Sequence, residues 1–287
     1  MPIRQTSLRS FHVVEQLPID YSSEIFAHYP RLKLGVTQSV NYYGAQLSRM
    51  ADHIITESLP DCTDWAITGP AYNVLPGGPN LLCAYMHEHL GNTLPDSIAL
   101  SVVKLRVEPD DLEITNSESL NNYHNYSMFS QQDRTKLYEQ SREPLIEPHD
   151  FRGRSILFVN DIHVTGTQQR YMQRAFDKVH PQQICWLYIL AVDRGIAEAH
   201  PEVEYQINHS CIASFEEFAE LLATHDLEYT SRCITRLLSY DVSQIATMFH
   251  QLDQDRKRTI LELAMAEGRF GGDYFKEKID LLKSCVG

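Results

Sequence analysis

Two unbroken apolar runs constrain the fold of this chain more than any other sequence feature. Residues 184–192 read ICWLYILAV and residues 155–159 read SILFV, with no charged side chain in either run. A strand that is apolar at successive positions is buried on both faces, as in a parallel sheet covered by helices on both sides. Weaker strand candidates lie at 64–68 and 98–107. The sequence therefore predicts an α/β fold with a mostly parallel sheet flanked by helices.

Helical patterns lie on either side of this core along the chain. Apolar residues recur at three- and four-residue spacing from Gly35 to Pro60, which predicts one amphipathic helix that ends at the proline. After residue 212 the pattern is again helical, and it opens with a capping box at Ser214 and Glu217. Further helices are predicted near 230–240, 242–251, 255–267 and 273–284.

These patterns divide the chain into three expected parts. They are an N-terminal helical or hood segment (1–60), an α/β core (61–212) and an all-α C-terminal extension (213–287). Within the core, residues 108–150 carry little apolar periodicity, so we expect a long excursion there with room for one strand pair. Excursions of this length are usually functional or mobile.

Composition excludes several function classes. The 287 residues include 25 Lys and Arg against 38 Asp and Glu, and the formal net charge of −13 opposes sequence-independent binding to nucleic acid or anionic membranes. No run of about 18 apolar residues exists, and the first residues lack the apolar stretch of a signal peptide, so we expect a cytoplasmic protein. The six cysteines contain no C-x-x-C pair, which argues against a zinc site or a redox dithiol.

The stretch 155–176, SILFVNDIHVTGTQQRYMQRAF, carries most of the chemical information. An apolar strand leads through a short loop into a helix, and unpaired N–H groups at such a helix start favour a phosphate group. Gly166 lets the backbone approach closely, and the hydroxyls of Thr165 and Thr167 add donors. This loop is therefore predicted to bind a phosphate monoester.

The polar pair Asn160 and Asp161 precedes this loop. Both side chains accept hydrogen bonds, and they lie at the right distance along the chain to meet the hydroxyls of a ribose whose phosphate sits on the loop. The Gly-Lys-Ser/Thr of a nucleotide-triphosphate loop is absent, which favours a sugar phosphate. The alternative explanation is an ordinary turn and helix cap built by the same residues.

At these residues the sequence resembles the type I phosphoribosyltransferase family, whose fingerprint is an apolar strand, two acidic residues, two variable residues and Thr-Thr-Gly-x-Thr. Asn160 stands at the position of the family's first acidic residue, and Asp161 at the position of the second. The family's phosphate loop corresponds to Val164, Thr165, Gly166 and Thr167, and His163 also lies in this loop. Asn160 keeps the hydrogen bonding but lacks the charge. Val164 lacks the hydroxyl that the family carries.

A second stretch, 64–90, extends the resemblance. A strand runs into a Gly/Pro-rich loop and a helix, and the loop matches the family's pyrophosphate loop by position, at Gly69, Pro70, Ala71, Tyr72 and Asn73. The entry GGPN at 77–80 and the segment SQQDRTKLYEQ at 130–140 are similar to the ComF-like branch, whose members are encoded in stress-response operons of the tellurite-resistance type. The resemblance reaches over residues 61–195.

The resemblance implies transfer of ribose 5-phosphate from 5-phosphoribosyl 1-pyrophosphate (PRPP) to a nucleobase-like nitrogen acceptor, or the reverse reaction, with Mg²⁺ as cofactor. Asp161 would act as a catalytic residue that holds the ribose hydroxyls and, through them, the metal. Lys104 and Arg106 would meet the pyrophosphate, together with Arg134 and Lys136 on a flexible loop. The small-molecule substrates would be the only partners, with no nucleic acid and no membrane, and a homodimer remains open.

Other readings of the same residues stay open at this point. Lys104 and Arg106 are equally well explained as solvated charges at a strand end, Arg134 and Lys136 as surface residues, and His163 as a loop-filling side chain. Tyr123 and Tyr126 are candidates to stack on a base. The alternative functions are a non-catalytic regulator that binds a phosphoribosyl group or nucleotide, and an interaction protein of a stress-response system that acts through 213–287.

Overall fold

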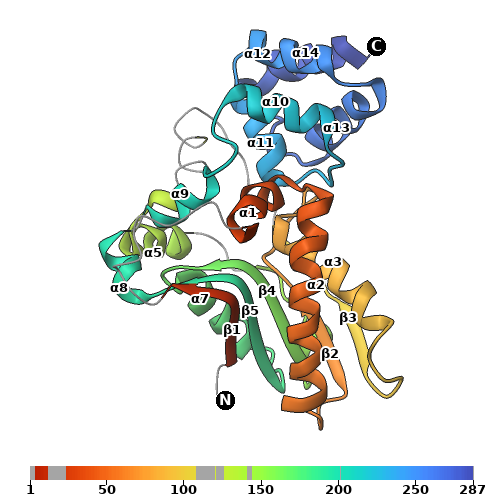
Figure 1. The fold of residues 1–287 in the computed structure, drawn as a ribbon, viewed down its shortest axis with the longest axis vertical. Coiled ribbons are helices and arrows are strands. Elements are labelled where there is room, and N and C mark those ends of the chain that lie inside the picture. The colour runs from red at the N-terminus through yellow and green to blue at the C-terminus, as the bar shows by residue number, and fades with distance from the viewer. Residues whose placement is uncertain are drawn as a thin grey trace.

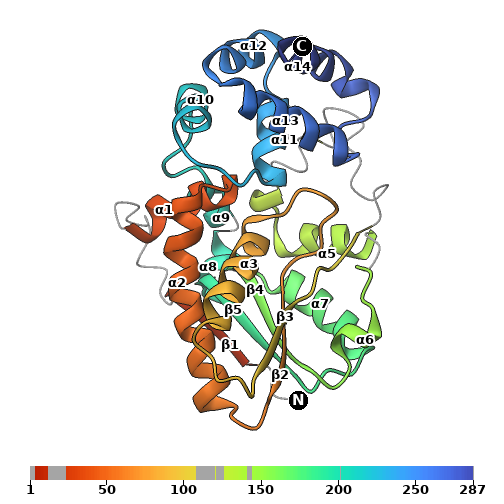
Figure 2. The ribbon, with the colours of Figure 1, turned by 90° about the vertical axis from the view of Figure 1, so that its right-hand side faces the viewer.

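The computed structural model describes residues 4–11, 24–107, 120, 126–140, 144–200 and 202–286. At its centre lies a five-stranded sheet with the order β1-β5-β4-β2-β3, in which every neighbouring pair is parallel (Figures 1 and 2). The predicted α/β class is confirmed, and the sheet is parallel throughout. The strands are β1 (Arg4–Phe11), β2 (Asp64–Thr68), β3 (Ala99–Val102), β4 (Ser155–His163) and β5 (Gln183–Val192).

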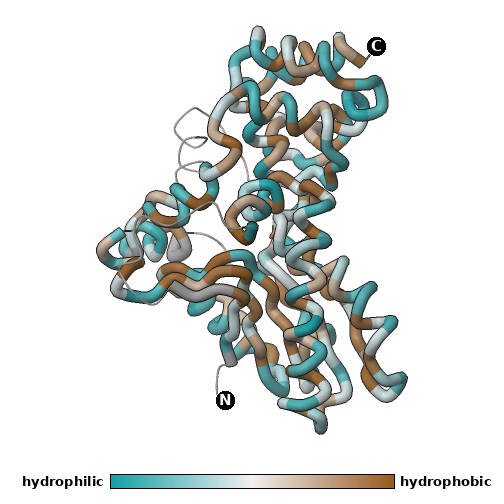
Figure 3. Tube along the Cα trace, viewed as in Figure 1, coloured by the Kyte–Doolittle hydropathy of each residue, from teal (hydrophilic) through white to brown (hydrophobic). Residues whose placement is uncertain are grey.

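The two apolar runs form the central strands β4 and β5, which are buried on both faces. Leu157, Val159 and Leu187 face one layer of helices, and the alternate residues Phe158 and Trp186 face the other. The first layer is formed by α1 (Glu24–Leu34), α2 (Thr37–His53) and α3 (Gly78–Gly91), and the second by α7 (Thr167–Asp177). Figure 3 shows the strands of the sheet as a brown, hydrophobic centre. Two covered faces explain why these strands carry no polar alternation.

The N-terminal segment contributes more than the expected helix. The predicted helix is α2, continued by a π-helical turn at Ile54–Ser58, and α1 precedes it. Residues 4–11 form the edge strand β1, which pairs with β5 from Arg4↔Cys185 to Phe11↔Val192. The description of 1–60 as a helical segment is therefore incomplete, because its first described element belongs to the sheet.

The excursion after β3 is helical where the structure describes it. The strand expected over 98–107 is shorter, and beyond it Arg106 forms only an isolated antiparallel bridge with Leu145. The segment that was expected to be a flexible loop carrying Arg134 and Lys136 is the helix α5 (Gln131–Gln140), which corrects that prediction. A short 3-10 turn, Tyr126–Met128, and the helix α6 (Pro148–Phe151) lie on either side of it. Tyr123 and the side chain of Tyr126 lie outside the described residues.

The chain after β5 is helical to its end. The helices are α8 (Arg194–Ala199), α9 (Val203–Asn208), α10 (Phe215–Thr224), α11 (Ser231–Ser239), α12 (Val242–Gln251), α13 (Gln254–Ala266) and α14 (Lys276–Val286), with a 3-10 turn at Asp273–Phe275. Side-chain caps begin several of them, including the predicted capping box of Ser214 and Glu217. We call residues 213–286 the helical region. It lies at the top of Figures 1 and 2, at the opposite end of the molecule from the N-terminus.

The helical region has an apolar core of its own, and side chains from the α/β part contribute to this core. Leu34, Val36 and Leu75 of the α/β part pack into it. Backbone hydrogen bonds join Glu228 to Gly35 and Ser231 to Pro76, so the helical region is fixed to the end of α1 and to the loop after β2.

Two further features of the described residues concern the cysteines and the length of the apolar helices. All six cysteines are free thiols. No helix in the described part of the chain combines the length and the apolar character that crossing a membrane requires.

Candidate functional site

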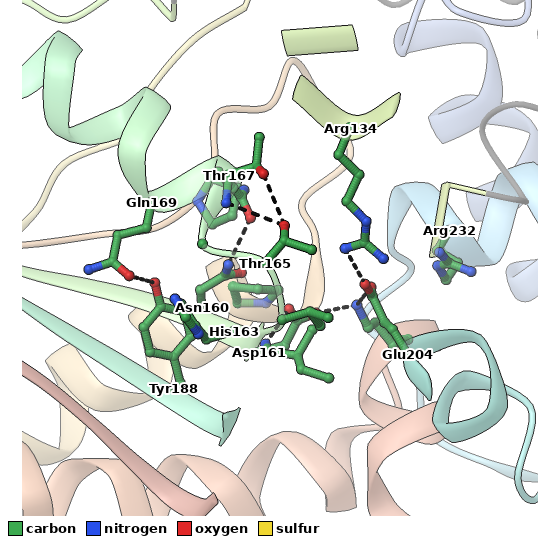
Figure 4. A pocket seen from close by; sticks show the side chains of 17 residues that line it. Arg134, Asn160, Asp161, His163, Thr165, Thr167, Gln169, Tyr188, Glu204 and Arg232 are labelled. Carbon is green, nitrogen blue, oxygen red and sulfur yellow. Dashed lines mark hydrogen bonds and ion pairs between the residues drawn. The ribbon is translucent and has the colours of Figure 1, made fainter. Parts of the chain in front are cut away.

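A cavity of about 210 Å³ lies beyond the carboxyl end of β4. The chain leaves β2 toward β3 on one side and leaves β4 toward β5 on the other, and such a reversal of direction opens a crevice at the carboxyl edge of a parallel sheet. Figure 4 shows the side chains that line it, from β4, the loop into α7, α1, α5, α9 and α11. The cavity is thus built from elements that lie far apart in sequence.

The loop after β4 forms one wall of this cavity and presents unpaired amides. The backbone N–H groups of Val164, Thr165 and Gly166 make no hydrogen bond within the described part of the chain, and the Thr165 and Thr167 hydroxyls lie 3.0 Å apart. Gly166 has a φ of 68° and directly precedes the eleven-residue helix α7. Unpaired amides at a helix start carry partial positive charge, so this wall favours an anion.

Gly166 is required here for two reasons. Its positive φ is costly for any side chain, and a Cβ would lie 3.1 Å from both Arg170 Nη1 and His163 Nε2. Arg170 donates hydrogen bonds to the Thr165 carbonyl (3.0 Å) and the Thr167 hydroxyl (3.1 Å), which brings a permanent positive charge to the loop. The glycine therefore leaves room for the side chains that shape the anion site.

His163 contributes no charge to this wall at neutral pH. Burial and the neighbouring Arg170 lower the pKa of its imidazole, which packs edge-on against Tyr188 with 5.3 Å between ring centres. The positive potential of the loop therefore comes from the amides and Arg170.

Asn160 and Asp161 lie inside β4 rather than after it, because the strand extends to His163. Successive strand residues point to opposite faces of a sheet, so the two side chains diverge. The Asn160 amide donates to Gln168 Oε1 of α7 (2.9 Å), whereas the Asp161 carboxylate meets α1, where it forms an ion pair with Lys33. Only one of the two side chains therefore carries negative charge into the cavity.

A buried network of charges surrounds Asp161. Lys33 also lies 4.0 Å from Glu204 of α9, and Arg134 of α5 donates a 2.8 Å hydrogen bond to the same carboxylate. Burial alone would raise the pKa of Glu204, but the charges of Arg134 and Lys33 outweigh it and hold this pKa below its ordinary value. Glu204 is therefore ionised at neutral pH and fixes both cations in place.

Arg232 of α11 completes the cationic side of the cavity. It makes no hydrogen bond or ion pair within the part of the chain that the structure describes, although its charge acts on Glu204 and Tyr29. Lys33, Arg134 and Arg232 together exceed the two carboxylates by one charge. An anion in the cavity would therefore meet a net positive set of side chains.

The structure brings together most of the residues predicted for the phosphate and ribose site. The cavity is lined by Asn160, Asp161, His163, Val164, Thr165, Gly166 and Thr167, together with Pro70 and Arg134. It is not lined by Gly69, Ala71, Tyr72, Asn73, Lys104, Arg106 or Lys136. Lys136 is exposed, 3.9 Å from Asp133, and the exposed Arg106 pairs through its backbone with Leu145. Both therefore lie away from this cavity.

Lys104 follows β3 and contacts the loop after β2 rather than the cavity. Its ammonium donates to the Asn73 carbonyl and lies 4.2 Å from the centre of the Tyr72 ring. Burial lowers its pKa, as does the nearby Arg106. Lys104 therefore stabilises the predicted pyrophosphate loop from outside.

The predicted pyrophosphate loop is held by the helical region. The amides of Val74 and Leu75 donate to the Glu267 carboxylate at 3.0 and 2.7 Å, and the Asn73 side chain donates to the Glu267 carbonyl. The amide of Tyr72 donates to the Leu105 carbonyl. The amide of Tyr72, inside the predicted loop, and the amides of Val74 and Leu75, directly after it, are thus already bonded inside the protein.

Sequence reasoning missed Lys33, Glu204 and Arg232. Each is a single charged residue on a helix outside the 155–176 stretch, with no motif around it. What distinguishes them is their position in the fold, because the buried Glu204 of α9 meets the partly buried Lys33 across from α1. No local pattern identifies such a pair.

The donor set suits a metal ion held mainly by its substrate. No three His, Cys, Asp or Glu side chains gather in a metal-binding arrangement among the described residues. Mg²⁺ usually binds through one or two carboxylates together with substrate oxygens. Asp161, with Glu204 close by, fits such a partial role.

Comparison with known families agrees with this geometry. The carboxyl-edge crevice, the strand-loop-helix anion wall and the carboxylate of Asp161 lie together at one edge of a parallel α/β sheet. The sequence profile described as PRTase ComF-like matches residues 6–282, so the chain belongs to the ComF-like phosphoribosyltransferase family. The match includes the helical region, which the resemblance over 61–195 did not reach. No curated protein matches the chain.

Proposed function

We propose that this protein is a phosphoribosyltransferase that uses PRPP and transfers its ribose 5-phosphate to a nitrogenous base, or catalyses the reverse reaction, with Mg²⁺ and in the cytoplasm. One observation carries the proposal: unpaired amides of Val164, Thr165 and Gly166 line the same cavity as the carboxylate of Asp161. The amides suit the 5-phosphate, and Asp161 suits the ribose hydroxyls. These are the two groups by which a ribose 5-phosphate is recognised.

The charges of the cavity suit the proposed chemistry. When the C1–O bond of PRPP breaks, positive charge grows on the ribose and negative charge grows on the pyrophosphate. Asp161 would stabilise the ribose, while Arg134 and Arg232 would stabilise the leaving group through their positive charges. Mg²⁺, when bound, would neutralise part of the pyrophosphate charge.

The proposal is tested by calorimetric titration with PRPP and Mg²⁺, followed by an assay of pyrophosphate release over a panel of nucleobases. We expect binding of PRPP and release of pyrophosphate with at least one base. Asp161→Ala should remove both. Unchanged PRPP affinity in Asp161→Ala would contradict the proposed site.

A second candidate function is a phosphoribosyl-binding regulator of a stress-response system. The pairing of Lys33 with Asp161 favours it, because a ribose hydroxyl would have to share this carboxylate with the ammonium or displace the ammonium. Asn160 in place of an acid and the bonded amides of the loop after β2 point the same way. Binding of PRPP without turnover on any base would support this function over the first.

A further inference from the structure

A second cavity, of about 260 Å³, lies beside the first. It is lined by residues of α1, α9 and α11 and of the segments next to them, and it shares Lys33 and Arg232 with the first cavity. The predicted phosphate loop, 163–167, lines only the first cavity, so a ligand in the second cavity would be held by other groups. The volume is several times the roughly 30 Å³ that one water molecule occupies, so a polyatomic ion fits.

The lining of the second cavity carries positive charge and no negative charge. Lys33, Arg232 and Arg236 are its charged side chains, and none of the lining residues is Asp or Glu. His209 also lines the cavity, and burial lowers the pKa of its imidazole, which is therefore neutral at neutral pH. Three cations thus face a space that contains no carboxylate.

Arg232 and Arg236 lie on the same face of α11. They are four residues apart, and like charges at this spacing on a helix repel each other. The carboxylates on which their charges act, Glu204 and Glu217, do not line the cavity. An anion from solvent would relieve this repulsion from inside the cavity.

The three cations still have N–H groups to donate. Arg232 makes no hydrogen bond or ion pair within the described residues. Arg236 uses three of its five N–H groups in hydrogen bonds to the protein. The ammonium of Lys33 has three N–H groups and forms its ion pair with Asp161. Donors from two helices, α1 and α11, are therefore available to an anion.

We infer that the second cavity binds a doubly charged oxyanion of the phosphate type, at a site separate from the one proposed for PRPP. Two negative charges are favoured over one because three cations and no carboxylate line the cavity. The oxygens of a tetrahedral ion point in several directions and can accept from α1 and α11 together, whereas the two oxygens of a carboxylate match a single arginine. Free phosphate and the phosphate group of a larger molecule share this chemistry.

Lys33 links the two sites. An anion in the second cavity competes with Asp161 for the ammonium, so it should free this carboxylate for a ribose hydroxyl. This link rests on the proposed function, whereas the anion site itself does not. Lys33→Met should therefore act on the two ligands in opposite directions, weakening the anion and strengthening the sugar phosphate.

The test fills the first site before the second is measured. Inorganic phosphate is titrated by calorimetry into the full-length protein saturated with PRPP and Mg²⁺, so that the positions of the sugar phosphate and its pyrophosphate are already occupied. We expect one phosphate to bind per chain, and acetate to bind at least tenfold more weakly at equal ionic strength. Methyl phosphate distinguishes the two sources, because tighter binding than phosphate indicates a group on a larger molecule and weaker binding indicates the free ion.

Substitutions assign the site to its side chains. Arg232→Met should weaken phosphate binding at least tenfold, and Arg258→Met, which alters an exposed arginine of α13, should leave it unchanged. Lys33→Met should weaken phosphate binding at least threefold while it tightens ribose 5-phosphate binding about tenfold, and Lys33→Arg should keep both affinities. Thermal unfolding shows whether each variant is folded under the conditions of the titration.

Three outcomes would overturn the inference. The first is phosphate binding that is undetectable at millimolar concentration in the PRPP-saturated protein, including the case in which the free protein binds phosphate and PRPP displaces it. The second is equal affinity for acetate and phosphate. The third is a folded Arg232→Met protein with wild-type affinity for phosphate.

Failure of PRPP to bind would contradict the proposed function and leave the second cavity to be tested alone. Gly166→Ala, which impairs the phosphate loop of the first cavity, is then the starting protein. It should bind one phosphate per chain, and Arg232→Met added to it should remove that binding. Absence of phosphate binding to the folded Gly166→Ala protein would overturn the anion site as well.

Discussion

The ammonium of Lys33 pairs with the carboxylate of Asp161, joining the last turn of α1 to the carboxyl end of β4. The side chains are 13% and 9% exposed, so the pair is largely shielded from water. Strand alternation points Asp161 to the face of the sheet that α1 covers, which makes this contact a direct result of the register of β4. Any sugar hydroxyl that binds Asp161 must share it with Lys33 or displace Lys33.

The first prediction concerns this pair. Lys33→Met should strengthen Mg²⁺-dependent binding of ribose 5-phosphate about tenfold, because the Asp161 carboxylate is released and the local positive charge falls by one. Calorimetric titration with and without Mg²⁺ measures the effect. Lys33→Arg keeps the charge and should show no gain. Weaker binding of the folded Lys33→Met protein in Mg²⁺ would mean that Lys33 contacts the ligand instead of competing with it.

The second prediction concerns the positive φ of Gly166. Gly166→Ala should lower the affinity for ribose 5-phosphate at least tenfold, because the new Cβ presses on His163 and Arg170, and should cost about 1–2 kcal/mol of stability. Gly153→Ala is the matched control. It has a φ of 73° but no atom within 4 Å of its Cβ, so it should show a similar loss of stability and normal binding. Equal affinity of both variants for ribose 5-phosphate would show that the loop around Gly166 does not bind the phosphate.

The third prediction is a pH dependence of folding stability. The pKa of Glu204 is lowered in the folded protein, so its ionised form stabilises the fold above its ordinary pKa of 4.5, and this contribution is lost as the pH falls toward the lower folded value. Glu204→Gln should cost about 3–5 kcal/mol at pH 7, since it removes the buried carboxylate that pairs with Arg134 and lies beside Lys33.

Urea unfolding from pH 7 to pH 3 measures the effect of this substitution. The difference between wild type and Glu204→Gln should shrink below pH 4.5. Glu198→Gln, at an exposed pair with Arg194, should change stability by no more than about 1 kcal/mol at any pH. A pH-independent difference for Glu204→Gln would contradict an ionised, stabilising carboxylate.

The fourth prediction concerns the link between the helical region and the loop after β2. Glu267→Ala removes an acceptor that is fully buried and bonded to the amides of Val74 and Leu75, so it should cost about 2–4 kcal/mol. Hydrogen exchange at those two amides should accelerate more than at β4. Glu262→Ala, on the exposed side of α13, should leave the stability and the exchange rates of both amides unchanged. Normal exchange at Val74 and Leu75 in Glu267→Ala would show that other contacts hold this loop.

The fifth prediction concerns the residue that departs from the acidic pair. Asn160→Asp should be tolerated, because Gln168 can rotate its amide and donate to the new carboxylate in place of accepting from Asn160. The added charge should tighten Mg²⁺-dependent binding of ribose 5-phosphate about threefold or more. Asn92→Asp makes the same change of charge at the exposed end of α3 and should leave binding unaltered. A loss of affinity in Asn160→Asp would indicate that the site is selected for an uncharged side chain.

The parts of the fold that the sequence predicted are those with local signals. β4, β5 and the loop at 163–167 follow from an apolar run, a turn with a glycine and a helix start, all within a few residues. β1 left no such signal because RQTSLRSF is largely polar, which is compatible with an edge strand and equally with a loop. Its place in the sheet depends on pairing with β5.

The parts of the site that escaped prediction depend on tertiary contacts. Arg134 was identified as a candidate, but its burial beside Glu204 reflects the packing of α5 on α9, not the pattern of residues 130–140. Lys33 and Arg232 approach the cavity only because the helical region and α1 close over the carboxyl edge of the sheet. The phosphate wall is therefore readable from sequence, whereas the cations that face it require the structure.

The pairing of β1 with β5 also affects how this protein can misassemble. β1 and β5 lie far apart along the chain. One side of β5 therefore stays unpaired until β1 docks against it. During that interval the backbone of β5, an almost wholly apolar strand, is exposed along one side and can bond with a strand from another molecule. Pairing with the largely polar β1 covers this side of β5 and leaves a more polar strand at the edge of the sheet.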